Sequence, residues 1–563
     1  MIVSGDACPK HPWAPITIAK QLQQTAERYP TADAFVSGTD RMTWAETEKL
    51  TRRLAKSLLV MGVRPGDHIA LWMPNRVEWP LMWLAAAHVG AAIIPINTRY
   101  KADEVAYILN QSDARLLVLV DRFLDIDYLA MLKTLCPNLG DASAPNADDF
   151  PKLQNIVTLP RGPRGTITWE ELLELGNNVE DQDLDDLVDS VDYEDPTIIV
   201  YTSGTTGFPK GAVHSHRILR NECSIAGYLE VESSSRILGH MPFFHVAGAF
   251  SGILIGLITG GALILMERWD PEEALRLIER ERVSMLGGIP THFIDLLAHP
   301  ELDKFDTSSL KSGWIGGAMN PREVIDGVIN RLGMPGLLPV YGMTETTSAT
   351  TLSRMGDDRE LIYAGKGLPV SDFELKVSNT EGEALPSGLE GEICVRGHLV
   401  MQGYYRNPEA TAHTMDTGGW FHTGDLGILD QSGYLAVTGR KSDLFIVGGS
   451  NAYPAEIERV LASHPDVNQA YVVGVPDSRL GEVGFAFVEP KAGTSLDEEQ
   501  IRAFCRERLA NFKVPKMVRF VDSWPRTATG KIERFRLKEM GLAAEQDQSQ
   551  TSHTPTAHNR VSP

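Results

Sequence analysis

Short apolar segments of strand length alternate with longer amphipathic segments of helix length in the first half of the chain. Between Trp44 and about Asp270, the strand-like segments are residues 68–72, 92–95, 116–120 and 198–201. Strands joined by helices run parallel, because each connection has to cross back over the sheet, and the helices then cover its faces. The alternation therefore predicts an α/β fold with a large N-terminal domain of helix-covered, largely parallel β-sheets.

The second half of the chain has two other patterns. Residues 367–435 contain short alternating strands separated by Gly and Pro, which predicts a small β-barrel subdomain. Residues 444–545 carry their own helix and strand patterns, enough for a small α+β C-terminal domain. We therefore expect an N-terminal domain at residues 15–439, a junction at 440–443, a C-terminal domain at 444–545 and a disordered tail, rich in Gln, Ser, Thr and Pro, at 546–563.

Composition narrows the class of protein. The net charge of −21, with nine acidic and no basic residues from Glu180 to Asp195, argues against a nucleic-acid partner. The five cysteines include no Cys-x-x-Cys pair, and residues 1–15 lack a signal pattern, so we expect a reduced, cytoplasmic protein. Residues 248–266 are uncharged, but residues 259–261 (Thr-Gly-Gly) divide them into a helix, a turn and a strand, so we expect no membrane span.

A glycine- and hydroxyl-rich segment at residues 201–211 follows the apolar strand at 197–200. It reads Tyr-Thr-Ser-Gly-Thr-Thr-Gly-Phe-Pro-Lys-Gly, and differs from a Walker loop because Pro209 precedes the lysine and Gly211 follows it. Backbone N–H groups beside glycines, hydroxyls and a lysine all favour phosphate. A surface loop without ligand is the alternative. The pattern predicts a polyphosphate site formed by Thr202, Ser203, Gly204, Thr205, Thr206, Gly207 and Lys210.

Four further clusters combine small residues with one charged side chain. They are residues 339–347 with Glu345, 419–427 with Asp425, 439–443 with Arg440, and 527–532 with Lys531. Each alone has a simpler interpretation: a helix-capping acid, a turn residue, a surface ion pair or a solvated lysine. Their joint occurrence in this order favours one shared site.

In this order the clusters resemble the acyl-adenylate-forming superfamily, which includes acyl-CoA synthetases, adenylation domains and beetle luciferase. The resemblance covers roughly residues 15 to 545. It implies a two-step ligase. The carboxylate of the substrate first attacks the α-phosphate of MgATP, giving acyl-AMP and pyrophosphate; a thiol, usually that of coenzyme A, then displaces AMP and forms a thioester.

The resemblance also implies roles for particular residues. The loop from Thr202 to Lys210 should hold the β- and γ-phosphates, Glu345 should ligate Mg²⁺, and Thr344 should lie near the α-phosphate. Lys531 should reach both the α-phosphate and the substrate carboxylate. The remaining nucleotide-binding residues are expected to be, for adenine, Tyr341 with Gly342, Gly316, Gly317 and Ala318, and, for the ribose, Asp425 and Arg440.

The small C-terminal domain of this family swings about the junction between the two reactions. In this chain the swing would exchange the face bearing Lys531 for the face bearing Gly448 and Gly449, which would let the pantetheine arm of coenzyme A pass. The family commonly has Asp or Lys two residues after the junction arginine, whereas this chain has Ser442. The motion is therefore expected, with an altered pivot.

The acid is predicted only as a class. Amino-acid-activating relatives carry an aspartate where this chain reads Met-Pro-Phe-Phe-His-Val-Ala-Gly at 241–248, so an amine would be left unpaired. Phe244 and His245 resemble the aromatic segment of fatty-acyl and aryl-acyl ligases, with His245 as a gate. Pocket candidates Phe250, Trp314, Ile315, Gly316 and Met343 fit a fatty, alicyclic or aromatic acid of undetermined length.

Three functions stay open on the sequence. An acid–CoA ligase is favoured, a fatty-acyl-AMP ligase that loads a carrier protein is the alternative, and a non-catalytic regulator is opposed by the intact Lys210, Glu345 and Lys531. The pathway and the oligomeric state, including a homodimer, are not fixed by the sequence.

Overall fold

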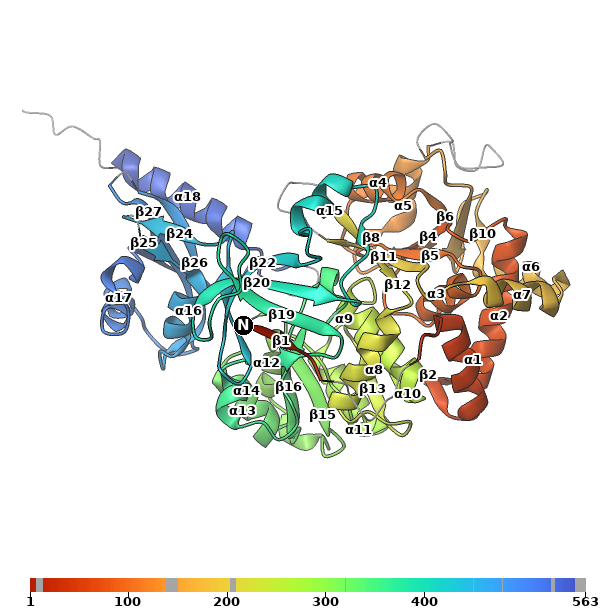
Figure 1. Ribbon diagram of the computed structural model, residues 1–563, viewed down its shortest axis with the longest axis horizontal. Coiled ribbons are helices and arrows are strands. Elements are labelled where there is room, and N and C mark those ends of the chain that lie inside the picture. The colour runs from red at the N-terminus through yellow and green to blue at the C-terminus, as the bar shows by residue number, and fades with distance from the viewer. Residues whose placement is uncertain are drawn as a thin grey trace, which may run out of the picture. The chain divides into compact units, whose positions relative to one another are not determined.

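The computed structural model describes residues 1–6, 14–137, 150–202, 209–318, 320–448, 450–477, 479–527 and 532–551. The chain divides into two compact units (Figure 1). The first contains Met1–Lys376, Cys394–Thr423 and Asp430–Leu435. The second contains Val377–Ile393, Gly424–Leu429 and the chain from Ala436 onward.

An eight-stranded sheet forms the first layer of the first unit. Its order is β10 (Ile167–Thr168), β9 (Asn155–Leu159), β6 (Ala114–Val120), β4 (His68–Trp72), β5 (Ala92–Pro95), β11 (Pro196–Thr202), β12 (Lys210–Ser215) and β21 (Gly403–Tyr404). The pairs from β10 to β11 are parallel, and β12 and β21 add antiparallel pairs at one edge. The strands predicted at 68–72, 92–95, 116–120 and 198–201 all lie here, so the expected parallel sheet is confirmed.

Two further sheets of the first unit are joined by isolated bridges. One has the order β13 (Arg236–Gly239), β14 (Ala262–Leu265), β2 (Asp33–Ser37) and β3 (Asp40–Thr43), and the other β15 (Ser312–Gly316), β16 (Gly336–Tyr341), β17 (Thr351–Leu352) and β18 (Leu368–Pro369). Met285 forms an isolated parallel bridge to β13 on one side and to β15 on the other. The two sheets therefore lie edge to edge in one layer. A two-stranded hairpin, β7 (Arg122–Phe123) with β8 (Ile126–Asp127), lies apart from them.

Helices surround these sheets in the red-to-green part of the ribbon (Figure 1). They are α1 (Ile18–Arg28), α2 (Trp44–Val60), α3 (Glu78–His88), α4 (Ala102–Gln111), α5 (Tyr128–Leu135), α6 (Trp169–Leu175), α7 (Asp181–Ser190), α8 (Ile218–Tyr228), α9 (Val246–Gly248), α10 (Ile255–Thr259), α11 (Pro271–Glu281), α12 (Pro290–Ala298), α13 (Arg322–Asn330), α14 (Arg359–Tyr363) and α15 (Pro408–Thr414). Helix α2 shows why these boundaries arise. The Thr43 side chain caps its first turn, and the Glu46 carboxylate accepts a hydrogen bond of 2.8 Å from the Thr43 backbone N–H.

The uncharged segment at 248–266 folds as a helix, a turn and a strand, as predicted. A π-helix at Ala249–Leu254 leads into α10, which ends at Gly260 with a φ of 78°, and β14 follows. Among the described residues, the helices are all too short or too polar to cross a bilayer. Most of the acidic run at 180–195 lies on the surface helix α7 (Asp181–Ser190).

The small β subdomain is an open sheet. Its order is β1 (Ile2–Ser4), β19 (Phe373–Ser378), β20 (Glu390–Gly397), β22 (Phe421–Leu429) and β23 (Leu435–Arg440). The predicted barrel is therefore an unclosed five-stranded sheet in the part of the chain that the structure describes.

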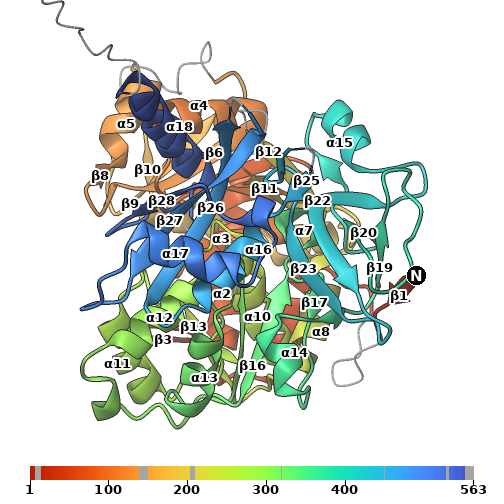
Figure 2. The ribbon, with the colours of Figure 1, turned by 90° about the vertical axis from the view of Figure 1, so that its left-hand side faces the viewer.

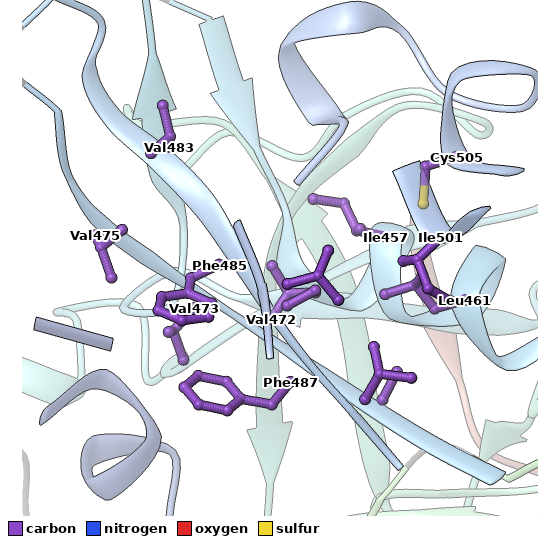
Figure 3. Close-up of a cluster of buried hydrophobic side chains, with 14 of the residues drawn as sticks. Ile457, Leu461, Val472, Val473, Val475, Val483, Phe485, Phe487, Ile501 and Cys505 are labelled. Carbon is purple, nitrogen blue, oxygen red and sulfur yellow. The ribbon is translucent and has the colours of Figure 1, made fainter. Parts of the chain in front are cut away.

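The second unit contains the predicted α+β core. Its sheet has the order β25 (Ser450–Ala452), β24 (Phe445–Val447), β27 (Gly481–Pro490) and β26 (Val467–Asp477), with β28 (Met517–Phe520) beside β27. Helices α16 (Pro454–Ala462), α17 (Glu498–Arg506) and α18 (Arg534–Thr551) accompany it in blue (Figure 2). Figure 3 shows Val472, Phe485 and Phe487 of the sheet beside Ile457 and Ile501 of the helices in one apolar core.

Replacing Phe487 with Ala should destabilise this core by about 3–5 kcal/mol, because the ring is fully buried and stacks on Phe485 at 4.7 Å. Hydrogen-exchange mass spectrometry on the full chain measures the loss within this unit. Phe535, which is 60% exposed on α18, is the control, and Phe535→Ala should change stability by less than about 0.5 kcal/mol. Equal losses at both positions would contradict the packing described.

Candidate functional site

The strands on either side of the predicted phosphate loop are antiparallel partners. Thr202 at the end of β11 lies opposite Lys210 at the start of β12. Helix α4 supports the base of this hairpin, since the Tyr107 hydroxyl donates to the Pro209 carbonyl at 3.1 Å. A strand follows the lysine, so the segment is not a strand-to-helix Walker turn. The remaining predicted loop residues, Ser203, Gly204, Thr205, Thr206 and Gly207, lie outside the described residues.

Glu345 lies beside the base of that loop. It sits in a short 3₁₀ helix, Thr344–Thr346, just after β16, and its Oε1 accepts a hydrogen bond of 2.9 Å from Tyr404. The Thr202 hydroxyl lies 3.5 Å from the same oxygen, and Lys210 Nζ lies 5.3 Å from the centre of the Tyr404 ring. Two predicted phosphate-site residues and the predicted metal ligand are therefore neighbours.

Tyr404 is a member of this site that the sequence motifs did not identify. Burial raises the pKa of Tyr404 far above its ordinary value and the adjacent Glu345 raises it further, so the hydroxyl stays a donor. Backbone bonds hold it in place: β21 pairs with β12, and the Met401 N–H donates to the Glu345 carbonyl at 2.8 Å. The signal available in the sequence was the Gly-Tyr-Tyr triplet at 403–405 after an apolar run.

The segment after β16 folds back tightly on itself. A Cβ on Gly342 would lie 2.0 Å from the Ser348 carbonyl oxygen, so only glycine fits this turn. Thr347 has a φ of 73°, and its hydroxyl donates to the Leu399 carbonyl, which holds the strained residue in place. Thr344 is buried within this turn. The motif is therefore a rigid platform for Glu345.

The predicted adenine-binding residues lie at the ends of two neighbouring parallel strands. β15 ends at Gly316, and β16 ends at Tyr341. Ligands of α/β proteins bind at such carboxyl edges. Gly317 and Ala318 are exposed directly beyond β15, and Gly317 has a φ of 79°, which favours glycine. The structure thus brings Gly317 and Ala318 to the sheet edge that Tyr341 and Gly342 occupy.

The predicted ribose-binding pair belongs to the second unit. Arg440 Nε lies 2.9 Å from Asp425 Oδ1, and Asp425 is buried on β22 while Arg440 ends β23. The Lys441 N–H donates to the Gly424 carbonyl at 2.8 Å, which fixes the two strand ends together. The structure confirms that these two residues are neighbours.

The remaining predicted residues of this unit are only partly described. Gly448 follows β24 with a φ of 56°, and its N–H donates to the Leu480 carbonyl at 2.7 Å. Gly449 and Lys531 lie outside the described residues.

A small cavity of about 10 Å³, with room for about one water molecule, lies next to the segment that carries His245. His245 caps α9 by accepting a bond of 3.3 Å from the Ala247 N–H at Nδ1, and the cavity wall includes Ala247. Trp314 of β15 also lines the wall, and its indole fits because a Cβ on Gly287 would lie 2.1 Å from the indole nitrogen. Among the lining side chains that the structure describes, the Ser251 hydroxyl and the Trp314 indole N–H are polar, and the others are aliphatic, methionine or glycine.

Two of the pocket residues predicted from the sequence lie in different places. Trp314 lines the cavity, whereas Phe250 packs into the core against Trp83 at 6.0 Å and the edge of His214 at 5.8 Å. The π-helix at Ala249–Leu254 explains the difference, because its wider turn shifts the side chains that follow His245. Ser251 faces the cavity in place of Phe250.

Comparison with known proteins matches most of the chain to AMP-binding enzymes. A family model described as AMP-binding enzyme matches residues 22–405, and one described as AMP-binding enzyme C-terminal domain matches residues 456–531. The putative acyl-CoA synthetase YngI of Bacillus subtilis is 37% identical over 531 residues, covering 93% of this chain and 96% of that protein.

A second relative is named for an unusual acid. The 3-[(3aS,4S,7aS)-7a-methyl-1,5-dioxo-octahydro-1H-inden-4-yl]propanoyl:CoA ligase of Mycobacterium tuberculosis is 39% identical over 527 residues, covering 93% of this chain and 99% of that protein.

Solved structures agree in fold. The fatty acyl CoA synthetase of Mycobacterium tuberculosis is 31% identical with a TM-score of 0.71, covering 94% of this chain and 99% of that one. ATP-bound MatB of Rhodopseudomonas palustris is 28% identical with a TM-score of 0.78, covering 93% and 98%. The acid–CoA ligase activity predicted from the motifs, AMP-forming and proceeding through acyl-AMP, is confirmed by these matches, and the chain belongs to the AMP-binding enzyme family.

Proposed function

We propose that this ligase activates a fatty, alicyclic or aromatic acid whose apolar body packs beside the wall of the cavity lined by Trp314 and whose carboxyl group lies near His245. The observation that supports this class of acid is the wall of that cavity, in which Trp314, Met241 and Met285 provide apolar surface. In the described part of the wall there is no charged side chain to pair with an amine or a second carboxylate. The names of two relatives, a fatty acyl CoA synthetase and an alicyclic propanoyl:CoA ligase, agree with this class.

We propose a binding residue for each part of the nucleotide. We infer that the hairpin from Thr202 to Lys210 holds the β- and γ-phosphates, since its base meets Glu345. Adenine would lie at the carboxyl edge of β15 and β16, beside Gly316 and Tyr341. The ribose hydroxyls would bind Asp425 and Arg440, a buried acceptor with its own positive partner.

The oxygen donors around Glu345 fit Mg²⁺. This ion prefers one or two carboxylates together with substrate phosphates. Glu345 offers a carboxylate, and the Thr202 hydroxyl lies 3.5 Å from its Oε1. We propose that Glu345 holds the ion and that Tyr404 orients its carboxylate. When bound, Mg²⁺ neutralises charge on the phosphates of ATP.

Two anions have to meet in the first reaction, so the site needs positive charge where they join. The acid's carboxylate oxygen attacks the α-phosphorus, and the bond to pyrophosphate breaks. Lys210 would stabilise the departing pyrophosphate, and Lys531 the α-phosphate and the carboxylate. Thr344 would donate a hydrogen bond near the α-phosphate. The coenzyme A thiolate then attacks the acyl carbon, and AMP leaves.

We propose that the two reactions take place with the C-terminal domain in two different positions. We propose an N-terminal domain at 15–439, a pivot at 440–443 and a mobile domain at 444–545. After adenylation the face with Lys531 would give way to that with Gly448 and Gly449, which admits the pantetheine arm.

Two wider properties are also proposed. Cys136, Cys223, Cys394 and Cys505 are buried and outside disulfides, which supports a reducing, cytoplasmic location. We propose a homodimer, which light scattering tests by measuring the molar mass in solution.

A panel of acids tests the substrate class. With ATP, Mg²⁺ and coenzyme A, AMP release measured by chromatography should occur with medium-chain fatty and alicyclic acids, and should be absent with amino acids and malonate. Release of AMP that requires coenzyme A would support coenzyme A as the thiol acceptor. Accumulation of acyl-AMP without it, and no thioester with it, would instead indicate a carrier protein as acceptor.

Replacing Lys531 with Ala should slow adenylation about 10²–10³-fold, because a charged donor to the transition state is lost. Thioester formation from supplied acyl-AMP should persist, and separate assays of the two half-reactions measure this. Lys538, exposed on α18, provides the control, and Lys538→Ala should leave both reactions unchanged. Equal loss of both half-reactions in Lys531→Ala would reject the assignment.

Replacing Tyr404 with Phe should raise the Mg²⁺ concentration needed for nucleotide binding by about tenfold, because Glu345 loses a charge-assisted hydrogen bond while the ring over Lys210 remains. Titration of a fluorescent ATP analogue with Mg²⁺, without acid, measures this independently of turnover. The control is Tyr405→Phe, which removes a 3.0 Å bond to Asp113 instead. An unchanged Mg²⁺ titration in Tyr404→Phe would exclude the orienting role.

A further inference from the structure

A glutamate and an arginine bind the backbone at one edge of the sheet in the second unit. Strand β26 ends the order of that sheet, and helices α16 and α18 both pack on it (Figure 2). The Val472 N–H donates to Glu458 Oε1 at 2.8 Å, and Arg534 Nη1 donates to the Val472 carbonyl at 3.3 Å. An edge strand has no neighbouring strand to bond these groups. The two side chains therefore take the place of a further strand.

Glu458 and Arg534 also bond each other along the whole guanidinium fork. Arg534 Nη1 donates to Glu458 Oε1 and Nη2 donates to Oε2, each at 2.8 Å. The Glu458 side chain is 3% exposed and that of Arg534 is 31% exposed. A buried carboxylate needs a charged partner, and a two-pronged bond fixes the direction of the partner as well as its distance. Arg534 therefore has one defined place against α16 and β26.

This arginine directly follows the segment of the proposed catalytic lysine. It is the first residue of α18 and stands three positions after Lys531. On the other side of the segment, Arg526 forms an antiparallel bridge with Ile532, and Ile532 packs against the apolar core of the unit. The described residues that flank Lys531 are thus joined to each other by the bridge and to the rest of the unit by Ile532 and Arg534.

The same guanidinium reaches the proposed pivot. Arg534 Nε lies 3.6 Å from Asp443 Oδ2, and Asp443 is the last residue of the junction at 440–443. One side chain therefore contacts the junction, the helix α16 and the edge of β26. A swing about the junction would carry the segment of Lys531 together with these elements.

We propose that Glu458 and Arg534 are positioning residues that hold the segment of Lys531 where adenylation requires its charge. The inference rests on the proposed role of Lys531 in the first reaction. A lysine has a flexible stem and binds as a point charge, so the backbone that carries it has to set where the charge lies. A displacement of about 1 Å in an active site can lower the rate by about 10²-fold.

The proposal predicts different effects on the two half-reactions. Formation of the thioester uses the face with Gly448 and Gly449, which precedes β25 in the same unit. This second reaction needs the domain to be folded but does not need Lys531 in place. Loss of the anchor should therefore slow adenylation alone, whereas unfolding of the domain would slow both reactions.

A double variant, Glu458→Gln with Arg534→Gln, tests this. It leaves no charge buried without a partner, and the amides can still bond the N–H and carbonyl of Val472, but the charged fork is lost. Adenylation, measured as pyrophosphate release, should fall about tenfold or more. Thioester formation from supplied acyl-AMP, made from the acid that the wild-type enzyme activates best, should stay at the wild-type rate. Arg534→Lys keeps the charge without the fork and should lie between the two.

Arg506→Gln provides the matched control in the same unit. It removes an exposed pair of 2.6 Å with Glu499 on α17, so both half-reactions should stay at the wild-type rate. An unchanged rate of adenylation in the double variant would overturn the proposal. Equal losses in both half-reactions, with hydrogen exchange of residues 444–545 as in the wild type, would overturn it as well. If hydrogen exchange shows that the double variant opens this domain, Arg534→Lys decides: a selective loss of adenylation supports the anchor and an equal loss rejects it.

The Lys531→Ala variant separates failure of this inference from failure of the proposed function. Equal losses of both half-reactions in Lys531→Ala reject the role of the lysine itself. A selective loss of adenylation in Lys531→Ala, without a selective loss in the variants of Glu458 and Arg534, rejects only the anchor.

Discussion

The hydrogen bond from Tyr404 to Glu345 joins segments that are far apart in the chain. Tyr404 is held by pairing of β21 with β12, and Glu345 stands on the turn that follows β16. The same contact brings Lys210 over the tyrosine ring. Because both sheets are rigid and parallel-cored, a single bond between their edges fixes the carboxylate relative to the base of the phosphate loop. The proposed nucleotide site depends on this junction.

Much of the fold was predictable, because the hydrophobic pattern reports burial directly. The strands at 68–72, 92–95 and 116–120 are buried throughout, and apolar apart from His68, since helices cover both faces of their sheet. The closed barrel was wrong in detail: alternating strands indicate a half-exposed sheet, but strand order and closure are set by long-range pairing that no local pattern encodes.

Residues of the proposed site also differ in how far the sequence could predict them. Glycines and charged residues in compact motifs, such as Gly342 and Glu345, could be proposed from the sequence because their chemistry is local. Tyr404 was missed because it contacts a motif far away in sequence, and an isolated tyrosine carries no local signal. Phe250 was a pocket candidate because it is apolar and follows His245, whereas the structure buries it in the core against Trp83.

Gly287 determines where the Trp314 ring can lie. The indole of Trp314 occupies the space that any side chain at position 287 would need, so a larger residue there would force the ring out of its place. If the acyl body packs beside Trp314 as proposed, a single substitution at position 287 would reshape the acyl site. The residues proposed to bind ATP would stay unchanged.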